Sequence, residues 1–552
     1  MKLSGAKVVM ECLLEQGVDT VFGYPGGTIM PLYDALYDYT DDGRVTHILT
    51  SHEQGATHAA DGYARSTGKV GVCFVTSGPG ATNTVTGIAT ANMDSSPIIV
   101  ISGQVTVDSI GRDSFQEVDI VGITLPVVKH SFALRRAEDI APAVRKAFQI
   151  ARSGRPGPVL IDIPKNLFGA VVEYEKKDAL PLFPCPEVDK DAVKRLADLI
   201  NKAERPVIYA GGGVNIANAS GELTKLAKKA DIPVGTTLMC LGCIDRRDPL
   251  SLGMVGMHGE KEANLAYSHA DLLIAVGARF SDRVIGDPNR FAQDATIVHI
   301  DLDISEIDKN IGTDFSVIGD VKAVLEALLP LVKKNKHPQW LAEIASWKRK
   351  VEKHTKFGPD TIFPVLYEEF GEDAIVATDV GQHQMWTAQR WPFSKPRHFI
   401  TSGGLGTMGF GLGAAIGSQK AHPDKQVILI SGDGSFRMNL NELITVSSQG
   451  MPIMVFVMKN QTLGMVRQWQ KLFFGRRYSA TDLPDVLDYE KLAASVGLTG
   501  IEVTNVEELK QAIAKVRETG RGGVIACDID LDENVWPIVP PGDAIMNIIT
   551  EE

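Results

Sequence analysis

Two polar residues follow apolar runs in the last third of the chain and together could hold a metal ion. Asp433 stands between two glycines in SGDGSF (431–436), directly after the run VILI (427–430). Asn460 follows a second run, MPIMVFVM (451–458), and helical spacing between the two runs predicts parallel strands. Carboxylate and amide oxygens at the carboxyl edge of a sheet suit Mg²⁺, which phosphate oxygens and water usually complete. The sequence therefore predicts a magnesium-dependent phosphate site at this edge.

The same stretch also has a simpler interpretation as a turn, because Asp-Gly pairs are common in tight loops. In the functional interpretation, Gly432 and Gly434 let a diphosphate approach the backbone, and the helix beyond them offers unpaired N–H groups. We expect Asn439 to cap this helix. One face of the helix is expected at Leu440, Leu443, Ile444 and Ser447.

A second acid, Glu53, stands at the expected start of a helix. It follows a short predicted strand in THILTSHEQGATHAADGYAR. The buried face of the helix is expected at Ala56, Ala59, Ala60 and Tyr63. An acid at a helix N-terminus is often there only because the helix dipole favours it, so the residue alone does not decide between this role and a chemical one.

These residues need a scaffold, and the chain provides a repeated strand-then-helix rhythm. At 552 residues it is too long for one hydrophobic core. Residues 70–103 read as strand, Gly-Pro-Gly loop, helix and strand, while 174–193 and 331–360 read as connections, the second largely helical. We predict an α/β fold of three domains, each a mainly parallel sheet flanked by helices, at 1–175, 190–335 and 355–540.

Composition argues against several classes of protein. A net charge of −12 disfavours a nucleic-acid partner, which needs a basic face. No apolar stretch reaches the roughly 18 residues of a membrane span. The N-terminus forms an amphipathic helix, with Val8, Val9, Cys12, Leu13 and Gln16 on one face, and lacks the apolar core of a signal peptide. We expect a cytoplasmic protein that binds neither nucleic acid nor membrane.

Two further sequence patterns, a cysteine pair and a glycine-rich strand end, indicate a binding site only weakly. Six cysteines do not make a disulfide framework in a chain of this length, and Cys240 and Cys243 have zinc-ligand spacing without a second pair to complete a site. The strand end AGGGVNI lacks the third glycine of GxGxxG, so it does not by itself indicate a dinucleotide site.

The GDG motif followed after about 25 residues by Asn resembles the diphosphate signature of thiamine diphosphate enzymes. The order of the three predicted domains and the stretch SHEQGATHAADGYAR extend the likeness over essentially the whole chain, which resembles the catalytic large subunits of the acetohydroxyacid synthase (acetolactate synthase) family. The resemblance implies a pyrimidine-binding domain, a central FAD-binding domain and a diphosphate-binding domain, in that order. It also implies Mg²⁺ bound by Asp433, Asn460 and the backbone carbonyl of Thr462.

The family pattern implies a thiamine diphosphate site shared between two subunits, and hence a homodimer or tetramer. One subunit would contribute residues on the pyrimidine side, namely Tyr24, Pro25, Glu53, Pro79 and Asn83. The other would contribute Val380, Gly381, Gln382, His383, Gly406, Met408, Gly432, Gly434, Ser435 and Met438, the last of which holds the cofactor bent. Turn formation remains an equal explanation for the glycines at 78 and 80.

The resemblance also assigns catalytic roles. Glu53 would promote the imino tautomer of the cofactor's aminopyrimidine, and Gln116 would donate to developing oxyanions. The other catalytic or substrate-side positions are Gly27, Phe115, Lys165, Arg283, Met465 and Trp469. Without the family pattern, Lys165 would be read as a solvated surface lysine and the pair Met465 and Trp469 as core packing.

The segments GRPGP, GMHG and GARFSDRVIG resemble those by which this family holds FAD. The implied FAD contacts are Arg155, Gly211, Gly213, Met257, His258, Gly277, Arg279, Arg283, Asp301 and Asp320. Ser281 stands where the family commonly has a second Asp, which weakens one expected FAD contact but not the assignment. Because the carboligation is redox-neutral overall, the FAD is expected to be structural.

The implied activity converts pyruvate to hydroxyethyl-thiamine diphosphate and adds it to a second 2-keto acid. The products are 2-acetolactate or 2-aceto-2-hydroxybutyrate, for synthesis of valine, leucine and isoleucine, and a small regulatory subunit is a possible partner. Two alternatives are another decarboxylase or carboligase on the same scaffold, and a non-catalytic nucleotide-binding relative.

Overall fold

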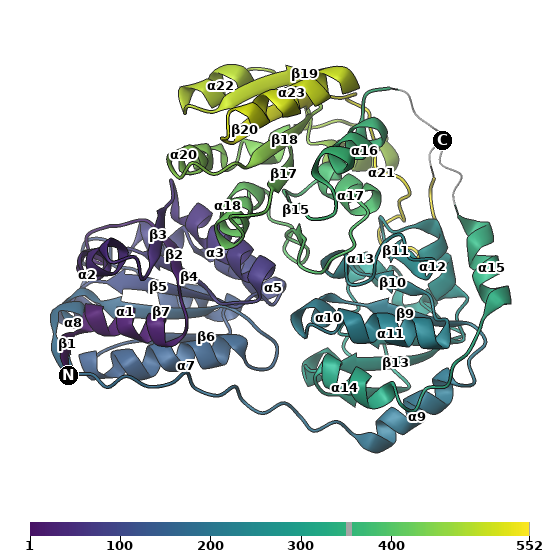
Figure 1. Cartoon of the computed structure of the whole chain (residues 1–552), viewed down its shortest axis with the longest axis horizontal. Helices are drawn as coiled ribbons and strands as arrows, with labels where there is room; N and C mark the ends of the chain where they lie inside the picture. The colour runs from purple at the N-terminus through teal and green to yellow at the C-terminus, as the bar shows by residue number, and fades with distance from the viewer. Residues whose placement is uncertain (349–355, 551–552) are drawn as a thin grey trace.

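The structure, a computed structural model, describes residues 1–348 and 356–550. The predicted connection at 331–360 and the predicted domain start at 355 therefore fall partly outside the described residues. Figure 1 shows three lobes, the first in purple and blue at the left, the second in teal at the right and the third in green and yellow at the top. Each lobe contains one six-stranded sheet whose neighbouring strands all pair in parallel, which confirms the predicted α/β class.

The first sheet has the strand order β3-β2-β4-β5-β7-β6. Its strands are β2 (Thr20–Gly23), β3 (Thr46–Leu49), β4 (Gly71–Val75), β5 (Ile98–Gln104), β6 (His130–Ala133) and β7 (Val159–Pro164). Helices α1 (Gly5–Glu15), α2 (Met30–Asp41) and α7 (Ile140–Arg152) pack on one face, and α3 (Glu53–Thr67) and α5 (Val85–Met93) on the other. A short antiparallel pair joins β1 (Lys2–Ser4) to β8 (Val171–Glu173).

The central sheet has the order β11-β10-β9-β12-β13-β14. Its strands are β9 (Pro206–Ala210), β10 (Val234–Thr236), β11 (Ser251–Met254), β12 (Leu272–Val276), β13 (Thr296–Asp301) and β14 (Phe315–Ile318). One face is covered by α9 (Lys190–Ile200), α11 (Ser220–Ala230) and α14 (Val321–Leu328), the other by α12 (Lys261–Ser268) and α15 (Pro338–Trp347). An extended segment runs from the first lobe along the lower edge of Figure 1 to α9.

The third sheet has the order β16-β15-β17-β18-β20-β19. Its strands are β15 (Ile375–Thr378), β16 (Phe399–Ile400), β17 (Val427–Gly432), β18 (Met454–Lys459), β19 (Thr499–Val503) and β20 (Gly523–Asp528). Helices α16 (Pro359–Phe370), α17 (Gln382–Arg390) and α23 (Val506–Glu518) cover one face, and α18 (Gly411–Ala421), α20 (Leu443–Ser448) and α22 (Tyr489–Ser495) the other. Further helices connect these elements: α4 (Pro79–Thr82), α6 (Ile120–Thr124), α8 (Lys165–Gly169), α10 (Gly212–Ile216), α13 (Asp282–Ile285), α19 (Asp433–Phe436) and α21 (Gly464–Phe473).

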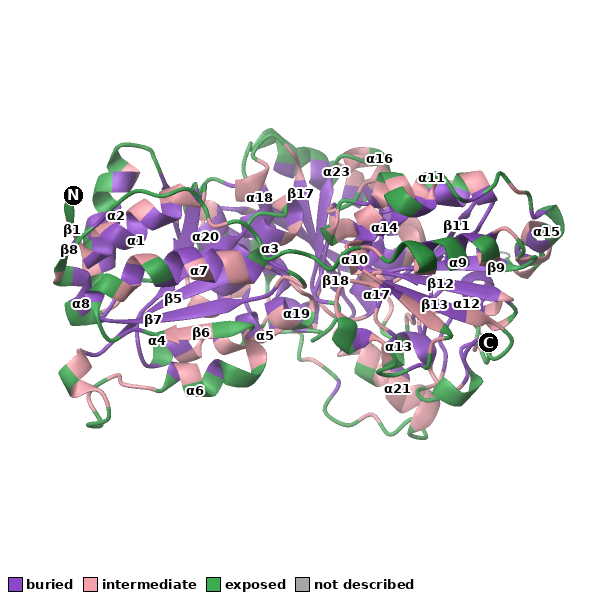
Figure 2. Ribbon diagram, turned by 90° about the horizontal axis from the view of Figure 1, so that it is seen from below, coloured by how far each residue is buried: buried purple, intermediate pink, exposed green. Residues whose placement is uncertain are grey.

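The sheets are the buried layers of the molecule, as the purple strands in Figure 2 show. β4, β5 and β17 carry nearly continuous apolar runs because both faces of each sheet are covered by helices. The face predicted for the N-terminal helix is confirmed at Val8, Val9, Cys12 and Leu13, all buried in α1.

The first and third lobes share one hydrophobic core, in which α3 packs directly on α18. A Cβ added at Gly417 would lie 1.8 Å from the carbonyl oxygen of Ala59, and one at Gly62 would lie 2.2 Å from that of Ala414. Only glycine allows the two helices to approach so closely. The predicted face of α3 is confirmed, since Ala56, Ala59 and Ala60 are fully buried.

One expectation is wrong at the start of the crossover between β17 and β18. Asn439 does not cap a helix with its side chain; its Nδ2 instead donates to the carbonyl of Gly409 at 3.0 Å. The chain first makes a short 3₁₀ turn at Leu440–Glu442 and then continues as α20. On the predicted face, Leu443 is buried but Ile444 is 54% exposed.

Two findings bear on the weaker patterns. Cys240 and Cys243 are buried free thiols, and the residues that the structure describes contain no cluster of three or more His, Cys, Asp or Glu side chains able to hold a metal ion. Within the described ranges, no helix is both long and apolar enough to cross a bilayer.

Candidate active site

The carboxyl ends of β17 and β18 bring the three predicted metal ligands together. Asp433 begins α19 at the end of β17, and Asn460 directly follows β18, which pairs with β17 in parallel. The backbone N–H of Gln461 donates to Asp433 Oδ2 at 2.7 Å, and that of Thr462 donates to Asn460 Oδ1 at 3.3 Å. Burial raises the pKa of Asp433 to about 6. A bound cation would offset this by favouring the carboxylate.

The two glycines of the GDG motif are required by neighbouring protein groups. A Cβ at Gly432 would lie 2.8 Å from Nδ1 of His383, and one at Gly434 would lie 2.6 Å from Cδ2 of Leu463. Any larger residue would displace the His383 ring or the Leu463 side chain, both beside the candidate metal ligands. This packing requirement holds whether or not a diphosphate also approaches the backbone here.

His383 is the residue at this edge best placed to meet a ligand. Its ring is buried, and burial lowers its pKa to about 3, so the ring is neutral at physiological pH. Its Nε2 has no hydrogen-bond partner in the part of the chain that the structure describes. An unpaired buried nitrogen next to Asp433 fits a site for an anionic group, to which it could donate. The residues present therefore fit a magnesium diphosphate.

The other predicted residues at this edge of the third lobe's sheet have different roles. Nε2 of Gln382 donates to Gln468 at 3.1 Å, and its Oε1 accepts from Asn460 at 3.4 Å. The Gln382 side chain thus orients a metal ligand rather than facing the cleft. The remaining predicted residues of this edge are the buried Ser435, the half-buried Val380, Gly381 and Met408, and the exposed Gly406 and Met438.

The pyrimidine-side residues gather at the carboxyl edge of the first lobe's sheet, after β2, β3 and β4. Nδ2 of Asn83 donates to Oε2 of Glu53 at 2.9 Å, and a Cβ at Gly80 would lie 3.2 Å from Oε1 of Glu53. Thr28 bonds to Thr76 through their hydroxyls at 3.0 Å and so holds the loop of Gly27 against the loop that leads to Pro79. Tyr24, Pro25, Gly27 and Pro79 are exposed.

The predicted substrate residues lie next to this group. Gln116 has a left-handed backbone conformation with φ +60°, and its carbonyl oxygen would lie 2.9 Å from a Cβ at Gly78. Glycine at 78, whose own φ is also +60°, is therefore needed for the Gln116 loop to approach. Phe115 is 87% exposed. Lys165 lies exposed at the start of α8.

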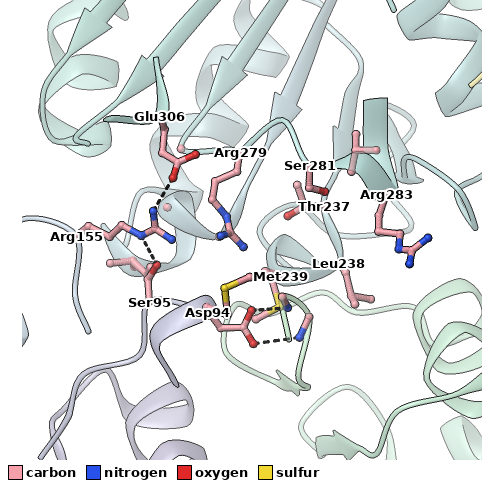
Figure 3. A pocket seen from close by; sticks show the side chains of 18 of the residues that line it. Asp94, Ser95, Arg155, Thr237, Leu238, Met239, Arg279, Ser281, Arg283 and Glu306 are labelled. Atoms are coloured by element: carbon pink, nitrogen blue, oxygen red, sulfur yellow. Dashed lines mark hydrogen bonds and ion pairs between the residues drawn. The ribbon is translucent and has the colours of Figure 1, made fainter. Parts of the chain in front are cut away.

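A cavity of about 1020 Å³ lies where the central lobe meets the other two (Figure 3). This volume is at the upper end of the roughly 300–1,000 Å³ of ligand pockets. Its walls contain every predicted FAD contact except Gly211: Arg155, Gly213, Met257, His258, Gly277, Arg279, Arg283, Asp301 and Asp320. Gly211 lies behind the wall, where a Cβ would be 2.3 Å from the carbonyl oxygen of Gly277.

Several lining residues were missed by the sequence analysis. Nη1 of Arg155 donates to Glu306 at 2.7 Å, and its Nε donates to Oγ of Ser95 at 2.8 Å (Figure 3). An acid shortly after the strand in HIDLDISEID was the only signal for Glu306. Thr237 Oγ1 and His258 Nδ1 belong to lining residues and have no partner among the described residues, so the cavity has polar atoms free for a ligand. The lining residues therefore fit FAD.

The same cavity reaches the third lobe. Val380, Gly381, Gly406, Met465 and Trp469 also line it. Met465 and Trp469 lie one turn apart on α21, and the Arg283 guanidinium carbon lies 5.6 Å from the centre of the Trp469 ring.

The predicted site is divided within one chain. Among the described residues, those lining the cavity do not include Glu53 or any of its predicted neighbours in the first lobe. The lining residues do not include Asp433 or His383 either, so within the described residues the cavity is distinct from both the Glu53 group and the Asp433 group.

Comparisons with known proteins agree over all three lobes. Residues 3–123 match the thiamine pyrophosphate enzyme N-terminal TPP binding domain, residues 193–328 the central domain and residues 379–527 the C-terminal TPP binding domain. The chain is 48% identical to the acetolactate synthase large subunit of Parasynechococcus marenigrum (strain WH8102), over 98% of this chain and 90% of that protein. It is 45% identical to the acetolactate synthase isozyme 2 large subunit of Escherichia coli (strain K12), over 98% of each.

Proposed function

The chain belongs to the acetolactate synthase large subunits of the thiamine pyrophosphate enzyme family, and on that premise we propose how its residues divide the reaction. The reaction transfers a two-carbon unit, formed by decarboxylation of pyruvate, to a second 2-keto acid. Pyruvate as acceptor gives 2-acetolactate, and 2-ketobutyrate gives 2-aceto-2-hydroxybutyrate, precursors of the branched-chain amino acids.

Thiamine diphosphate, when bound, supplies the carbanion chemistry of this reaction. Glu53 holds a proton at the edge of the aminopyrimidine and is itself oriented by the Asn83 amide, which donates to Oε2 and leaves Oε1 toward Gly80. Gln116 donates to the oxygen on which negative charge develops. Both groups belong to the half site of the first lobe.

Asp433, Asn460 and the carbonyl of Thr462 hold Mg²⁺, and Nε2 of His383 donates to the diphosphate. Two observations support this: the oxygen ligands meet at one sheet edge, and a neutral, unpaired imidazole nitrogen is buried beside them. The buried Asp433 carboxylate is then neutralised by the cation rather than by a proton.

FAD occupies the cavity between the lobes and acts structurally, because the reaction has no net redox step. Arg155, fixed by Glu306 and Ser95, contacts its polar groups from the rim. Arg283, next to the Trp469 ring, binds the carboxylate of the second keto acid. The alkyl end of that acid then faces Trp469.

The working molecule is a homodimer or a larger assembly built from it, in which the Glu53 half of one subunit meets the Asp433 half of another. Phe115 and Met438, at 87% and 60% exposure, are apolar side chains that such a contact would cover. The lobes correspond to a pyrimidine-binding domain at 1–175, an FAD-binding domain at 190–335 and a diphosphate-binding domain at 355–540. The relatives' names as large subunits imply a small regulatory partner.

The meeting of Asp433, Asn460 and His383 at one sheet edge carries this assignment, and a direct assay tests it. Purified protein with pyruvate, thiamine diphosphate, Mg²⁺ and FAD should form acetolactate, measured with creatine and naphthol as acetoin after acid decarboxylation. The Asp433→Ala variant should lose Mg²⁺-dependent cofactor binding in calorimetry. Release of CO₂ without acetolactate would favour the second candidate, a simple decarboxylase. Unchanged cofactor affinity in Asp433→Ala would return the GDG stretch to a turn.

A further inference from the structure

The loop at 401–409, TSGGLGTMG, carries two of the proposed cofactor contacts, Gly406 and Met408, and lies where all three lobes meet. We refer to it as the 401–409 loop. Asp94, directly after α5 in the first lobe, accepts two hydrogen bonds from it: Gly404 N–H donates to Oδ1 at 2.7 Å and Gly403 N–H donates to Oδ2 at 3.0 Å (Figure 3). The Asp94 side chain is fully buried. One carboxylate therefore satisfies two successive backbone donors of a loop in another lobe.

The carboxylate is itself held in place by a buried arginine. Arg65 Nη1 donates to Asp94 Oδ2 at 2.9 Å and to the carbonyl of Thr401, at the start of the loop, at 2.8 Å. The rest of the Arg65 guanidinium forms a bidentate pair with Asp61, with both bonds at 2.8 Å. Asp61 is as buried as Asp94 but no hydrogen bond connects it to the loop. The two acids thus share one cation and differ in whether they touch the loop.

The contacts of the loop with the first and central lobes are close at Gly403 and Gly404. A Cβ at Gly404 would lie 2.9 Å from Asp94 Oδ1 and 3.0 Å from Cβ of Met93, and one at Gly403 would lie 2.3 Å from the sulfur of Met239 in the central lobe. A further bond joins the hydroxyls of Thr407 and Thr90 at 2.7 Å. Thr90 lies one turn before Asp94, so the C-terminal end of α5 and the residue after it contact the loop at two points.

We propose that Asp94 is a positioning residue for the reaction: through Gly403 and Gly404 it sets the 401–409 loop so that Gly406 and Met408 form the wall of the cofactor site beside Val380. A Cβ at Gly406 would lie 3.9 Å from Val380, so the loop and the start of the 380–384 segment lie in contact range. Asp94 lines the cavity proposed for FAD, but its hydrogen bonds to the loop are made to Gly403 and Gly404 and not to Gly406 or Met408. The proposal rests on the proposed thiamine diphosphate site.

The test compares Asp94→Asn with Asp61→Asn. Asn at 94 keeps an acceptor for Gly404 but turns an NH₂ group toward Gly403 N–H and Arg65, which are both donors. Hydrogen bonds to a charged group are worth about 10- to 100-fold in an equilibrium constant, so the dissociation constant for thiamine diphosphate should rise by at least about tenfold. Asp61→Asn also removes a buried partner of Arg65, and should lower the melting temperature while leaving that constant within about twofold.

The measurement is calorimetry of thiamine diphosphate with the cofactor-depleted full-length protein at saturating Mg²⁺ and FAD, with kcat and KM for pyruvate as a second readout. Equal loss of affinity in both variants, or unchanged affinity in Asp94→Asn, would overturn the positioning role. Wild-type protein that neither binds the cofactor nor makes acetolactate would instead overturn the proposed function.

A second pair of variants covers the case in which Asp94→Asn does not fold. Gly404→Ala perturbs the same contact from the loop side, because its Cβ meets Asp94 Oδ1 at 2.9 Å. Gly221→Ala, in α11, meets no atom within 4 Å and serves as its control. Gly404→Ala should weaken cofactor binding by at least about tenfold and Gly221→Ala should not. Similar affinities in the two variants would contradict the proposal.

Discussion

Glu53 and Asp433 are both acids at the ends of parallel strands, but their surroundings suit different tasks. Glu53 is half-buried, and among the described residues its carboxylate accepts one side-chain hydrogen bond, from Asn83. Asp433 is 2% exposed and receives backbone N–H groups at both oxygens, from Gly434 and Gln461. A group that exchanges a proton with a ligand needs a free oxygen, whereas a metal ligand needs a fixed one.

Replacing Glu53 by Gln should reduce acetolactate formation about 100-fold or more. Gln keeps the size and a hydrogen bond but cannot hold the proton, and positioned acid-base groups typically contribute 10²- to 10⁴-fold. Initial rates at saturating cofactor measure the effect, and calorimetry should show that thiamine diphosphate still binds. A variant that keeps more than about a third of the wild-type rate would remove Glu53 from the mechanism.

Asp162, on β7, gives a pH-dependent prediction. It is buried, accepts from Ser102 Oγ at 2.6 Å and Gln104 Nε2 at 3.1 Å, and burial raises its pKa from 3.8 to about 6 despite the lowering effect of Arg135. Because the folded protein binds this proton more tightly than the unfolded chain, the group's contribution to stability is lost as pH rises from about 4 to about 6.

Asp162→Asn removes this titration. The melting temperature of the variant minus that of wild type should therefore rise by a few degrees between pH 4.5 and 7.5, most of it below pH 6. Thermal unfolding across that range measures the difference, and Asp178→Asn, which changes an exposed acid, should give a flat line. A difference that does not vary with pH for Asp162→Asn would show that the carboxyl is already ionised at pH 4.5.

At the scale of single residues, the sequence allowed us to predict only those site residues that directly follow a strand. Asp433 and Asn460 could be placed together because each follows an apolar run and the connection between the runs is a helical crossover. Asp94 and Glu306 could not be found in that way, since their partners lie 309 and 151 residues away in the sequence. Their roles depend on how whole lobes meet, which residue patterns do not encode.

Among the elements, α21 is the one that we propose selects the acceptor. It presents Met465 and Trp469 to the cavity from one face, with Arg283 over the Trp469 ring. The sequence left open whether this pair packs in a core. In the structure Trp469 is only half-buried and lines the cavity, so part of its side chain is available to a ligand.

Trp469→Leu should lower the ratio of acetohydroxybutyrate to acetolactate about tenfold or more when both keto acids are present. One methylene in an apolar pocket changes the discrimination between two substrates by about 10- to 200-fold. Leucine is smaller than tryptophan, so the variant lacks the part of the wall that this methylene contacts. Product ratios from a mixture of pyruvate and 2-ketobutyrate measure the change, while acetolactate formation from pyruvate alone should survive. Trp347→Leu, on α15 away from the cavity, is the matched control. An unaltered ratio in Trp469→Leu would mean that another side chain selects the acceptor.

Asn439 does not cap a helix, because a contact with another element takes its side chain. The capping rule places an Asn at the start of a helix, but here a 3₁₀ turn intervenes and the side chain reaches the Gly409 carbonyl, 30 residues back in the chain. A local preference of about 1 kcal/mol is readily outweighed by a tertiary contact that satisfies a buried carbonyl.

At the scale of the molecule, the three lobes were predictable and their arrangement was not. Repeated strand-helix patterns and two connections indicate three parallel sheets, and the structure contains them. The single core shared by the first and third lobes has no signature in the sequence beyond the small residues of α3 and α18. The proposed division of the site between two subunits depends on that arrangement.

If the two halves meet across subunits, two inactive variants should restore each other. Glu53→Gln and Asp433→Ala each damage a different half, so a mixed dimer holds one intact site. Equal mixing with subunit exchange should recover about a quarter of the wild-type activity, because half of the dimers are mixed and each has one good site of two. Activity assays after co-refolding measure this. No recovery, with mixed dimers confirmed by affinity tags, would mean that each chain builds its own site.

The direct contact between α3 and α18 also has a consequence for how this chain is made. The two helices are separated by roughly 350 residues, so at about 5–20 residues per second α3 leaves the ribosome some 20–70 s before its partner exists. During that time its inner face stays uncovered. That face includes Gly55, His58, Ala59 and Gly62, which together expose less apolar surface than leucine or phenylalanine would. The small residues that allow the close fit in the finished molecule therefore also limit the apolar surface that the nascent chain exposes before α18 is made.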